Sequence, residues 1–338
     1  MSRLKKSVMI TFLLLMPVLF FVASICIGRY SVSAADVMKS IAIAVSGKRI
    51  NGIDYKTYTV ITAIRMPRAF LGVLVGASLA VSGVAFQSIF RNPLVSSGML
   101  GVSNGAGFGA ALSIVLFGNA FWAPPFAFAF AILAVILSYL VGKVGGGSPT
   151  ITLLLGGTII QSIFSSLISL LKFVADTDSQ LPAITFWLMG SLASTKNSDI
   201  LLSGIPMVLG MAGLFLMRWR LNILSMGDKE ARTLGIDVGK NMASVIGFAT
   251  LATAGAVCVS GIVGWVGLIV PHIGRMLVGS DNKWLVPFSI SFGACFVLLV
   301  DTICRSFTGT EIPLGIITAL VGSPIFIWLL KKTKGASW

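Results

Sequence analysis

The sequence predicts an all-α integral membrane protein with ten transmembrane helices in a single domain covering residues 1–338. Three observations carry this prediction: few charged residues, a series of long apolar runs, and basic residues confined mainly to the segments between those runs. Charged residues make up 11% of the chain and hydrophobic residues 56%, whereas roughly 25% of the residues in a soluble domain are charged. These charges are too few to cover a globule of this size in water, so the chain belongs in lipid.

Nine apolar runs are long enough to cross a bilayer, since about 20 apolar residues span the hydrocarbon layer as a helix. They cover about 8–28, 69–90, 94–117, 121–142, 151–171, 199–217, 241–270, 284–304 and 312–330. The run at 241–270 is too long for one crossing and contains Gly261, Gly264 and Gly267 before Pro271. We therefore expect it to divide into a crossing and a short second helix or re-entrant segment that ends at about 279. The total is then ten.

The positions of Lys and Arg predict which ends of the helices face the cytoplasm. The net charge of +14 could suggest nucleic-acid binding, but the basic residues lie between apolar runs and form no single stripe with interleaved aromatics. With the N-terminus inside, ten crossings return the C-terminus to the cytoplasm, and the basic segment 218–240 also falls inside. The extracytoplasmic segment at about 29–65 is an exception, because it too is rich in basic residues.

A weak internal repeat is visible in the chain. Ser82-Gly83 followed by Pro93 recurs as Ser260-Gly261 followed by Pro271, at an offset of 178 residues. In the expected topology the two copies run in opposite directions, as in transporters built from an inverted repeat of about five helices. Chance remains an alternative, since Ser-Gly and Pro are common where helices pack tightly.

Catalytic and metal-binding motifs are missing from the sequence. It contains no G-x-x-x-x-G-K-[ST] phosphate loop and no H-E-x-x-H, and its one histidine is His272. Its four cysteines lie in or beside apolar runs without metal-ligand or disulfide spacing, so we expect no cofactor, no metal and no catalytic residue. Acidic residues are also missing from mid-helix positions, where an ion-coupled carrier usually keeps a relay. The source of energy therefore lies outside this chain.

The cytosolic loop at about 222–240 is predicted to carry a short docking helix. Asp228 or a neighbour can cap a helix that continues through Glu230, Ala231 and Leu234, and Gly235 is a natural stop. A short amphipathic helix on such a loop fits a groove in a partner protein. An ordinary solvated loop is the alternative.

Several motifs in order resemble the permease family that imports ferric siderophores, haem and cobalamin. They are Arg65-Met66-Pro67-Arg68, Gly76 to Gly83 with Gln87, Arg91-Asn92-Pro93-Leu94, Leu100 to Ala106, Trp187 to Leu192, Gly227 to Asp237, Gly264 to His272 with Arg275, and Glu311 to Gly315 with Thr318 and Gly322-Ser323-Pro324. The resemblance covers about residues 8–332. It implies the cobalamin-permease-like fold, in the cell membrane of a prokaryote with both termini cytoplasmic.

The resemblance also implies partners and site residues. The expected assembly is a homodimer, with a heterodimer of paralogous permeases left open, joined by two cytosolic ABC ATPase subunits and an extracytoplasmic substrate-binding protein. The expected sites are ATPase coupling at Gly227, Glu230, Ala231, Leu234 and Gly235, binding-protein docking at Arg65, Arg68 and Arg305, and gating of the translocation path at Asn92, Leu94 and Thr150. Two alternatives remain for the outer residues: Asp301 can pair with Arg305 at i, i+4, and Glu311 can cap the last helix.

The expected function is that of the permease subunit of an ATP-driven importer of a metal chelate. A ferric siderophore is the first expectation for the substrate, with haem, cobalamin and molybdate as alternatives. A secondary carrier or channel working alone is the alternative from another class, and the missing intramembrane acids and the predicted docking helix argue against it.

Overall fold

The computed structural model describes residues 3–46, 53–143, 149–307 and 310–332, and every regular element in these ranges is helical. The elements are α1 (Arg3–Cys26), α2 (Ala34–Ser46), α3 (Tyr55–Thr59), the π-helical turn η1 (Val60–Arg65), α4 (Met66–Phe90), α5 (Val102–Phe117), α6 (Ala123–Lys143), α7 (Pro149–Val174), α8 (Gln180–Met189), α9 (Asn197–Leu216), α10 (Arg218–Met226), α11 (Asp228–Thr233), α12 (Val238–Ser260), α13 (Val266–Val278), α14 (Asn282–Ser306) and α15 (Leu314–Lys332). The all-helical prediction is confirmed for the described part of the chain.

Seven described helices are long and apolar enough to cross a membrane, and three shorter apolar helices accompany them. The shorter ones are α5, α13 and residues 314–329 of α15. The run at 241–270 divides as expected, into α12 and α13, at Gly261 with its positive φ of 66°. Together these helices match the ten predicted apolar segments in order, while the number that crosses the bilayer stays a prediction, as does the inverted repeat.

Two segments differ from their expected structure. The second apolar helix begins at Tyr55, well before residue 69, because α3, η1 and α4 form one continuous helix from Tyr55 to Phe90. The π-helical turn η1 comes just before Pro67, whose ring removes one backbone donor, and a wider turn lets the helix continue past it. The expected loop at 172–198 contains the helix α8, whose Ile184 is buried in a small apolar cluster with Ala111 and Ile114 of α5.

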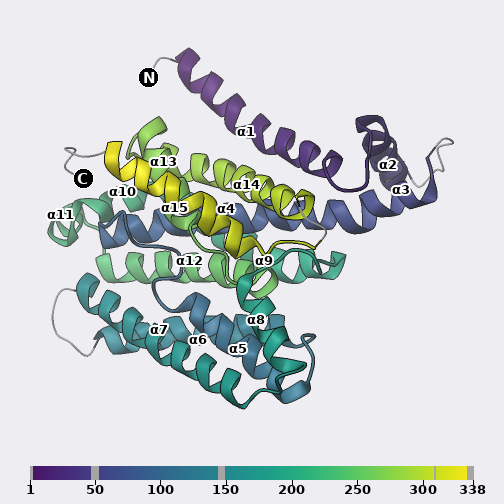
Figure 1. Cartoon of the computed structure of the whole chain (residues 1–338). Helices are drawn as coiled ribbons and strands as arrows, with labels where there is room; N and C mark the ends of the chain where they lie inside the picture. Colours follow the sequence, from purple (N-terminus) through teal and green to yellow (C-terminus); the bar gives the residue numbers. More distant parts are fainter. Residues whose placement is uncertain (1–2, 47–52, 144–148, 308–309, 333–338) are drawn as a thin grey trace.

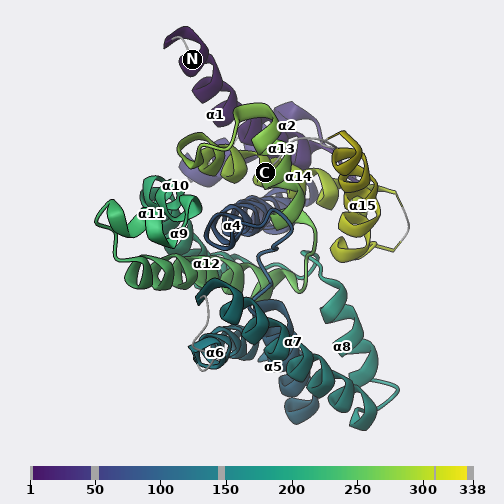
Figure 2. The same cartoon turned by 90° about the vertical axis from the view of Figure 1, so that its left-hand side faces the viewer.

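Helix α4 is the centre of the bundle. Figure 2, which looks nearly along it, shows α9, α12, α13 and α14 arranged around it. Its most apolar stretch is 83% buried, against 11% for that of α1. Small residues allow this packing: a Cβ added at Gly83 would overlap the carbonyl oxygen of Gly267, and one added at Gly76 would overlap that of Gly293. The backbones therefore touch where the sequence places glycine.

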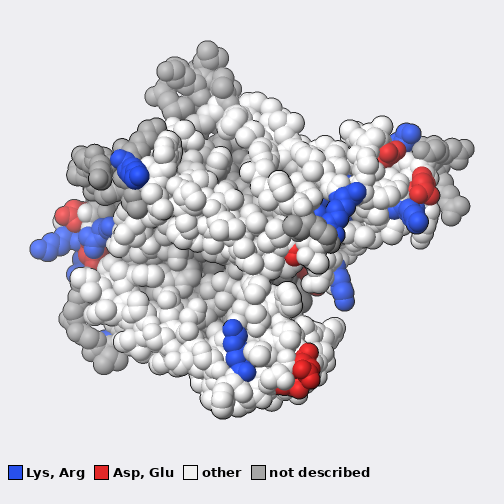
Figure 3. All heavy atoms as spheres, viewed as in Figure 1, with Lys and Arg blue, Asp and Glu red and all other residues white. Residues whose placement is uncertain are grey.

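The charged residues and the chain ends are arranged along one axis. In Figure 1, the first turn of α1, the end of α15 and the helices α10 and α11 lie at one end, and α2 and α3 lie at the other. Figure 3 shows Lys, Arg, Asp and Glu mostly toward these two ends, with a broad band between them that is almost free of charge. This arrangement is compatible with a membrane around the band. Below, the end with α11 is called the inner end and the end with α2 the outer end; which of them faces the cytoplasm stays a prediction.

We expect Gly83→Ala to lower the free energy of unfolding by about 1–3 kcal/mol, because its methyl group forces α4 away from α13. Gly247→Ala is the matched control: it also lies in a helix, α12, but nothing lies within 4 Å of an added Cβ. There the lower conformational entropy of alanine should leave stability unchanged or raise it by up to about 1 kcal/mol. Thermal unfolding of both variants in detergent measures the difference, and equal midpoints would show that the α4–α13 contact does not limit stability.

Candidate functional site

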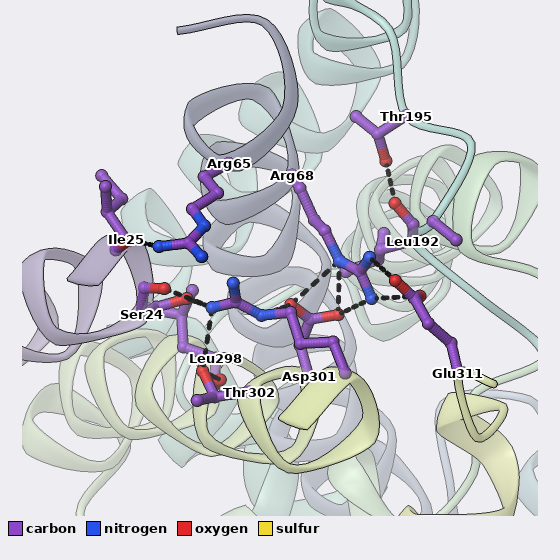
Figure 4. Close-up of polar contacts among 12 residues, drawn as sticks. Ser24, Ile25, Arg65, Arg68, Leu192, Thr195, Leu298, Asp301, Thr302 and Glu311 are labelled. Carbon is purple, nitrogen blue, oxygen red and sulfur yellow. Dashed lines mark hydrogen bonds and ion pairs between the residues drawn. The ribbon is translucent and has the colours of Figure 1, made fainter. Parts of the chain in front are cut away.

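The three arginines predicted to dock a partner gather in one cluster at the outer end. Arg65 ends η1, Arg68 lies in the first turn of α4, and Arg305 lies in the last turn of α14. Figure 4 shows Arg68 directed toward Asp301 of α14 and Arg65 directed toward Ile25. Arg305 forms an ion pair with Asp301. All three are buried, with 6%, 6% and 8% of their surfaces exposed. We call these three residues, with Asp301 and Glu311, the arginine cluster.

Arg68 binds both carboxylates of the cluster. Its Nε donates to Oδ1 and Oδ2 of Asp301 at 3.0 and 3.1 Å, and its Nη1 donates to Oε1 of Glu311 at 2.9 Å. Nη2 lies 2.9 Å from each carboxylate. Such forked pairs are the strong form of the hydrogen-bonded ion pair. Arg68 thereby joins α4 to α14 and to the stretch before α15. Glu311 lies in that stretch, because the last helix begins only at Leu314.

The other two arginines hold the end of α1. Arg65 Nη1 donates to the carbonyl oxygens of Ile25 and Cys26 at 2.7 and 3.2 Å. Arg305 Nη2 donates to the carbonyl oxygen of Ser24, and to its Oγ at 2.9 Å. The last carbonyls of a helix lack partners within the helix and carry its negative dipole end. Two guanidinium groups from distant parts of the chain therefore act as the cap of α1.

The cluster keeps a net positive charge, because three guanidinium groups face two carboxylates. The predicted pair of Asp301 and Arg305 is present, with Nε 3.5 Å from Oδ2. Asp301 is thus shared between Arg68 and Arg305, while the contacts of Arg65 are to uncharged carbonyls. The structure assigns these arginines internal contacts that the sequence predicted only in part, and their role in docking stays a prediction.

At the inner end, the predicted gate residues belong to different elements. Asn92 and Leu94 lie in the non-helical stretch 91–101 between α4 and α5, which we call the inner loop. Asn92 Oδ1 accepts a hydrogen bond from the backbone N–H of Leu94 at 2.9 Å, the local contact of an Asx turn. Leu94 is 56% exposed, whereas Thr150 is buried in the first turn of α7. The sequence also predicts a flexible hinge or turn at the glycines 145–147, which lie outside the described residues.

Two glutamines fix the backbone of the inner loop. Gln87 Nε2 donates to the carbonyl oxygens of Val95 and Gly267 at 3.1 Å each, and Gln87 Oε1 accepts from Arg275 Nη2 at 2.6 Å. Gln161 of α7 donates to the carbonyl oxygens of Gly98 and Met99 at 3.0 and 2.7 Å. Irregular backbone at membrane depth needs such partners inside the protein. The family resemblance included Gln87 but gave it no role. The sequence signal for a role is that Gln87 is the single side-chain amide in the apolar helix α4.

The predicted docking helix is present as α11. It begins at Asp228, after Gly227 with φ 130°, and Gly235 follows it with φ 76°. The N–H of Gly235 donates to the Arg232 carbonyl and that of Ile236 to the Ala231 carbonyl, which is the Schellman ending of a helix. Gly227, and not Asp228, occupies the N-cap position, and no side chain caps the helix. The predicted stop at Gly235 is confirmed.

The coupling residues divide into exposed and buried ones. Leu234 is 58% exposed and Glu230 is exposed, whereas Ala231 is fully buried against the bundle.

An ion pair of 3.7 Å between Arg91 Nη2 and Asp228 Oδ1 joins α11 to the start of the inner loop. Arg91 has the left-handed φ of 50°, which is uncommon for a residue with a side chain. The exposed face of α11 and the inner loop are therefore physically connected.

No group of three or more His, Cys, Asp or Glu side chains in the described ranges is placed to hold a metal ion. His272 is buried in α13, with its ring 5.9 Å from that of Phe326. Cys258, Cys295 and Cys304 are buried in the core as free thiols, and Cys26 is half-buried.

Comparisons with known proteins match nearly the whole chain. The profile of the FecCD transport family matches residues 14–332. The molybdate import system permease MolB of Haemophilus influenzae is 39% identical over 95% of both chains. A protein of Helicobacter pylori named as an iron chelatin transport system permease is 39% identical over 82% of this chain and 83% of its own. A solved structure assigned to the metal-chelate type ABC transporters, in an inward-facing conformation, is 36% identical, covers 97% of this chain and 99% of its own, and has a TM-score of 0.85.

Proposed function

Because the chain belongs to the FecCD transport family, we propose that it is the membrane-spanning permease subunit of an ABC importer for a metal chelate. The observation that carries this proposal is the match over residues 14–332, together with a fold that superposes on a metal-chelate ABC transporter along almost its full length. Importers of this kind hydrolyse ATP on a separate subunit. The chain is a multi-pass membrane protein, and we place it in the cell membrane of a prokaryote with both termini in the cytoplasm.

The contacts of the buried Asp301 argue against the alternative of a secondary carrier. Asp301 is a carboxylate inside a membrane-length helix, α14, and both Arg68 and Arg305 contact it. A proton or sodium relay needs an acid that can change its charge during transport. Asp301 instead forms ion pairs with Arg68 and Arg305 at the outer end, which is a structural role. The inferred source of energy is therefore a partner subunit.

For the assembly, we propose two copies of this chain, two cytosolic ATPase subunits and an extracytoplasmic substrate-binding protein. Within the metal-chelate class we propose a ferric siderophore as substrate. Relatives named for iron chelatin and for molybdate support the class, and haem and cobalamin remain alternatives.

We expect uptake of a ferric siderophore into vesicles that contain the chain, its ATPase and its binding protein, and only when ATP is supplied. A panel of ferric siderophores, haem, cobalamin and molybdate identifies the substrate by competition. Preferential uptake of molybdate or cobalamin would overturn the siderophore proposal and leave the importer intact. Uptake driven by an ion gradient without the ATPase would overturn the importer itself.

We propose that the exposed face of α11 couples to the ATPase. Glu230 and Leu234 present a charge and an apolar side chain on a short helix, the form in which a helix enters a partner's groove. Ala231, Gly227 and Gly235 then act as supports, through burial and through their backbone angles. For the gate, we propose that Asn92 and Leu94 move with the inner loop and that Thr150 belongs to a second gate segment.

We expect Leu234→Asp combined with Glu230→Lys to reduce ATP-driven transport by on the order of tenfold or more, because both changes fall on the proposed contact. Both side chains are exposed, so expression and thermal stability should match the wild type. Lys331→Gln, an exposed change on α15, is the control. Transport at the wild-type rate by the double variant would remove α11 from the coupling interface.

We propose that the net positive charge of the arginine cluster draws an acidic face of the binding protein to the outer end. The sharpest variant is Arg65→Gln, since Arg65 hydrogen-bonds to backbone carbonyl oxygens and its loss leaves the pairs of Asp301 in place. Reversal of Arg68 to glutamate would instead put a third carboxylate beside Asp301 and Glu311, so weaker docking could not be separated from misfolding.

We expect Arg65→Gln to slow capture of the binding protein several-fold at 0.1 M salt, with the difference shrinking at 1 M as the Debye length falls from about 10 Å to about 3 Å. Lys196→Gln removes one exposed charge outside the cluster and is the control. Association rates in nanodiscs measure the effect. Should Arg65→Gln lower thermal stability but leave capture unchanged at both salt concentrations, the cluster is a structural device only.

A further inference from the structure

A groove lies between α1 and α14. In Figure 1, α1 runs beside the other helices at its last turns and diverges from them toward its first turn. The groove in this wedge has a volume of about 590 Å³, and α4 and Phe215 at the end of α9 contribute to its walls. None of its lining residues belongs to the arginine cluster, α11 or the inner loop.

A hydrogen bond joins the two helices within the groove. Pro17 of α1 has no N–H, so it cannot donate to the Leu13 carbonyl, four residues earlier. Ser291 Oγ of α14 donates to that carbonyl at 2.7 Å instead. Leu13 and Ser291 both line the groove. A specific hydrogen bond therefore links α1 and α14 across the apolar groove. The separation of the two helices at this point is part of the folded structure.

The length of the groove matches half of a bilayer. Its lining on α14 extends from Lys283 to Ala294, which is about 16 Å at a rise of 1.5 Å per residue. The hydrocarbon layer is about 30 Å thick. Except near Lys283, the lining residues of α14 and α1 are almost all apolar, such as Ile290 and Leu14. An acyl chain that enters from one leaflet has the length and the chemistry to fill this space.

The inner end of the groove is basic. Arg218 and Lys283 line it there, and none of the lining residues is acidic. Aromatic rings support both cations: Arg218 Cζ lies 4.1 Å from the centroid of the Phe215 ring, and Lys283 Nζ lies 4.5 Å from that of Trp219. Trp219 and Trp284 are of the residue type that gathers at the headgroup level. The basic end thus lies at the depth at which a lipid phosphate sits.

We propose that this groove binds an anionic phospholipid from the leaflet at the inner end, with an acyl chain between α1 and α14 and the headgroup phosphate at Arg218 and Lys283. The proposal requires only that the chain lies in a membrane, so it does not depend on the transported substrate. The charge of the headgroup identifies the ligand: a zwitterionic lipid offers the same acyl chains with no net charge for the two cations.

Native mass spectrometry of the full chain tests the proposal with two lipids of equal chain length, phosphatidylglycerol and phosphatidylcholine. We expect wild type to retain phosphatidylglycerol preferentially, and Arg218→Gln combined with Lys283→Gln to reduce this preference by on the order of tenfold, since each cation near the surface contributes about fivefold. Lys331→Gln is the matched control, because this exposed residue of α15 lies outside the groove. It should keep the wild-type preference.

A second variant tests the apolar part of the groove. Val73→Trp fills it from α4 without touching either cation, and it should release the bound lipid while folding is retained. Equal retention of the two lipids by wild type would overturn the proposal. So would a loss of the preference for phosphatidylglycerol in Lys331→Gln as large as in the Arg218/Lys283 double variant, because the preference would then reflect general electrostatic attraction at the inner end. Release of the lipid when two chains associate would assign the groove to a second copy.

Discussion

The structure depends on one constraint: inside a hydrocarbon layer, a backbone group that leaves the helical pattern has no water to bind and must find a partner in the protein. At three such places in the described part of the chain, polar side chains supply the missing bond. Gln87 and Gln161 bind carbonyls of the inner loop. Ser291 binds the carbonyl freed by Pro17. Arg65 and Arg305 bind the last carbonyls of α1. These five polar side chains therefore serve the backbone.

The sequence predicted the apolar segments and their order well, because length and hydropathy alone decide whether a helix fits a bilayer. The division at Gly261 was predicted on the same grounds, since a run of 30 apolar residues exceeds one crossing. The early start of the second helix at Tyr55 was missed. Pro67 indicated a helix start, and only a π-helical turn, which depends on packing and not on local composition, lets the helix extend past it.

For the candidate site, the sequence identified which residues matter better than what they contact. The pair of Asp301 and Arg305 was predictable because it is local, at i, i+4. The bond from Arg68 to Asp301 spans 233 residues, and that from Arg305 to Ser24 spans 281. The hydrophobic periodicity of a sequence does not predict contacts between residues so far apart along the chain. A similar limit applies to Gln87, whose partners lie on the inner loop and on α13. The comparison of motifs singled out these residues, and only the structure gave them partners.

The cap of α1 has a consequence for the order in which the chain matures in the membrane. This helix is synthesised before its partners, because the guanidinium groups that bind its terminal carbonyls arrive with Arg65 and then with Arg305, 281 residues after Ser24. At about 5–20 residues per second, the second group emerges roughly 15–60 s later. During that time the outer turn of α1 keeps its carbonyls in the headgroup region, where water satisfies them. Docking of α14 then replaces that water, so α1 precedes α14 into the bilayer but is fixed in place only when α14 arrives.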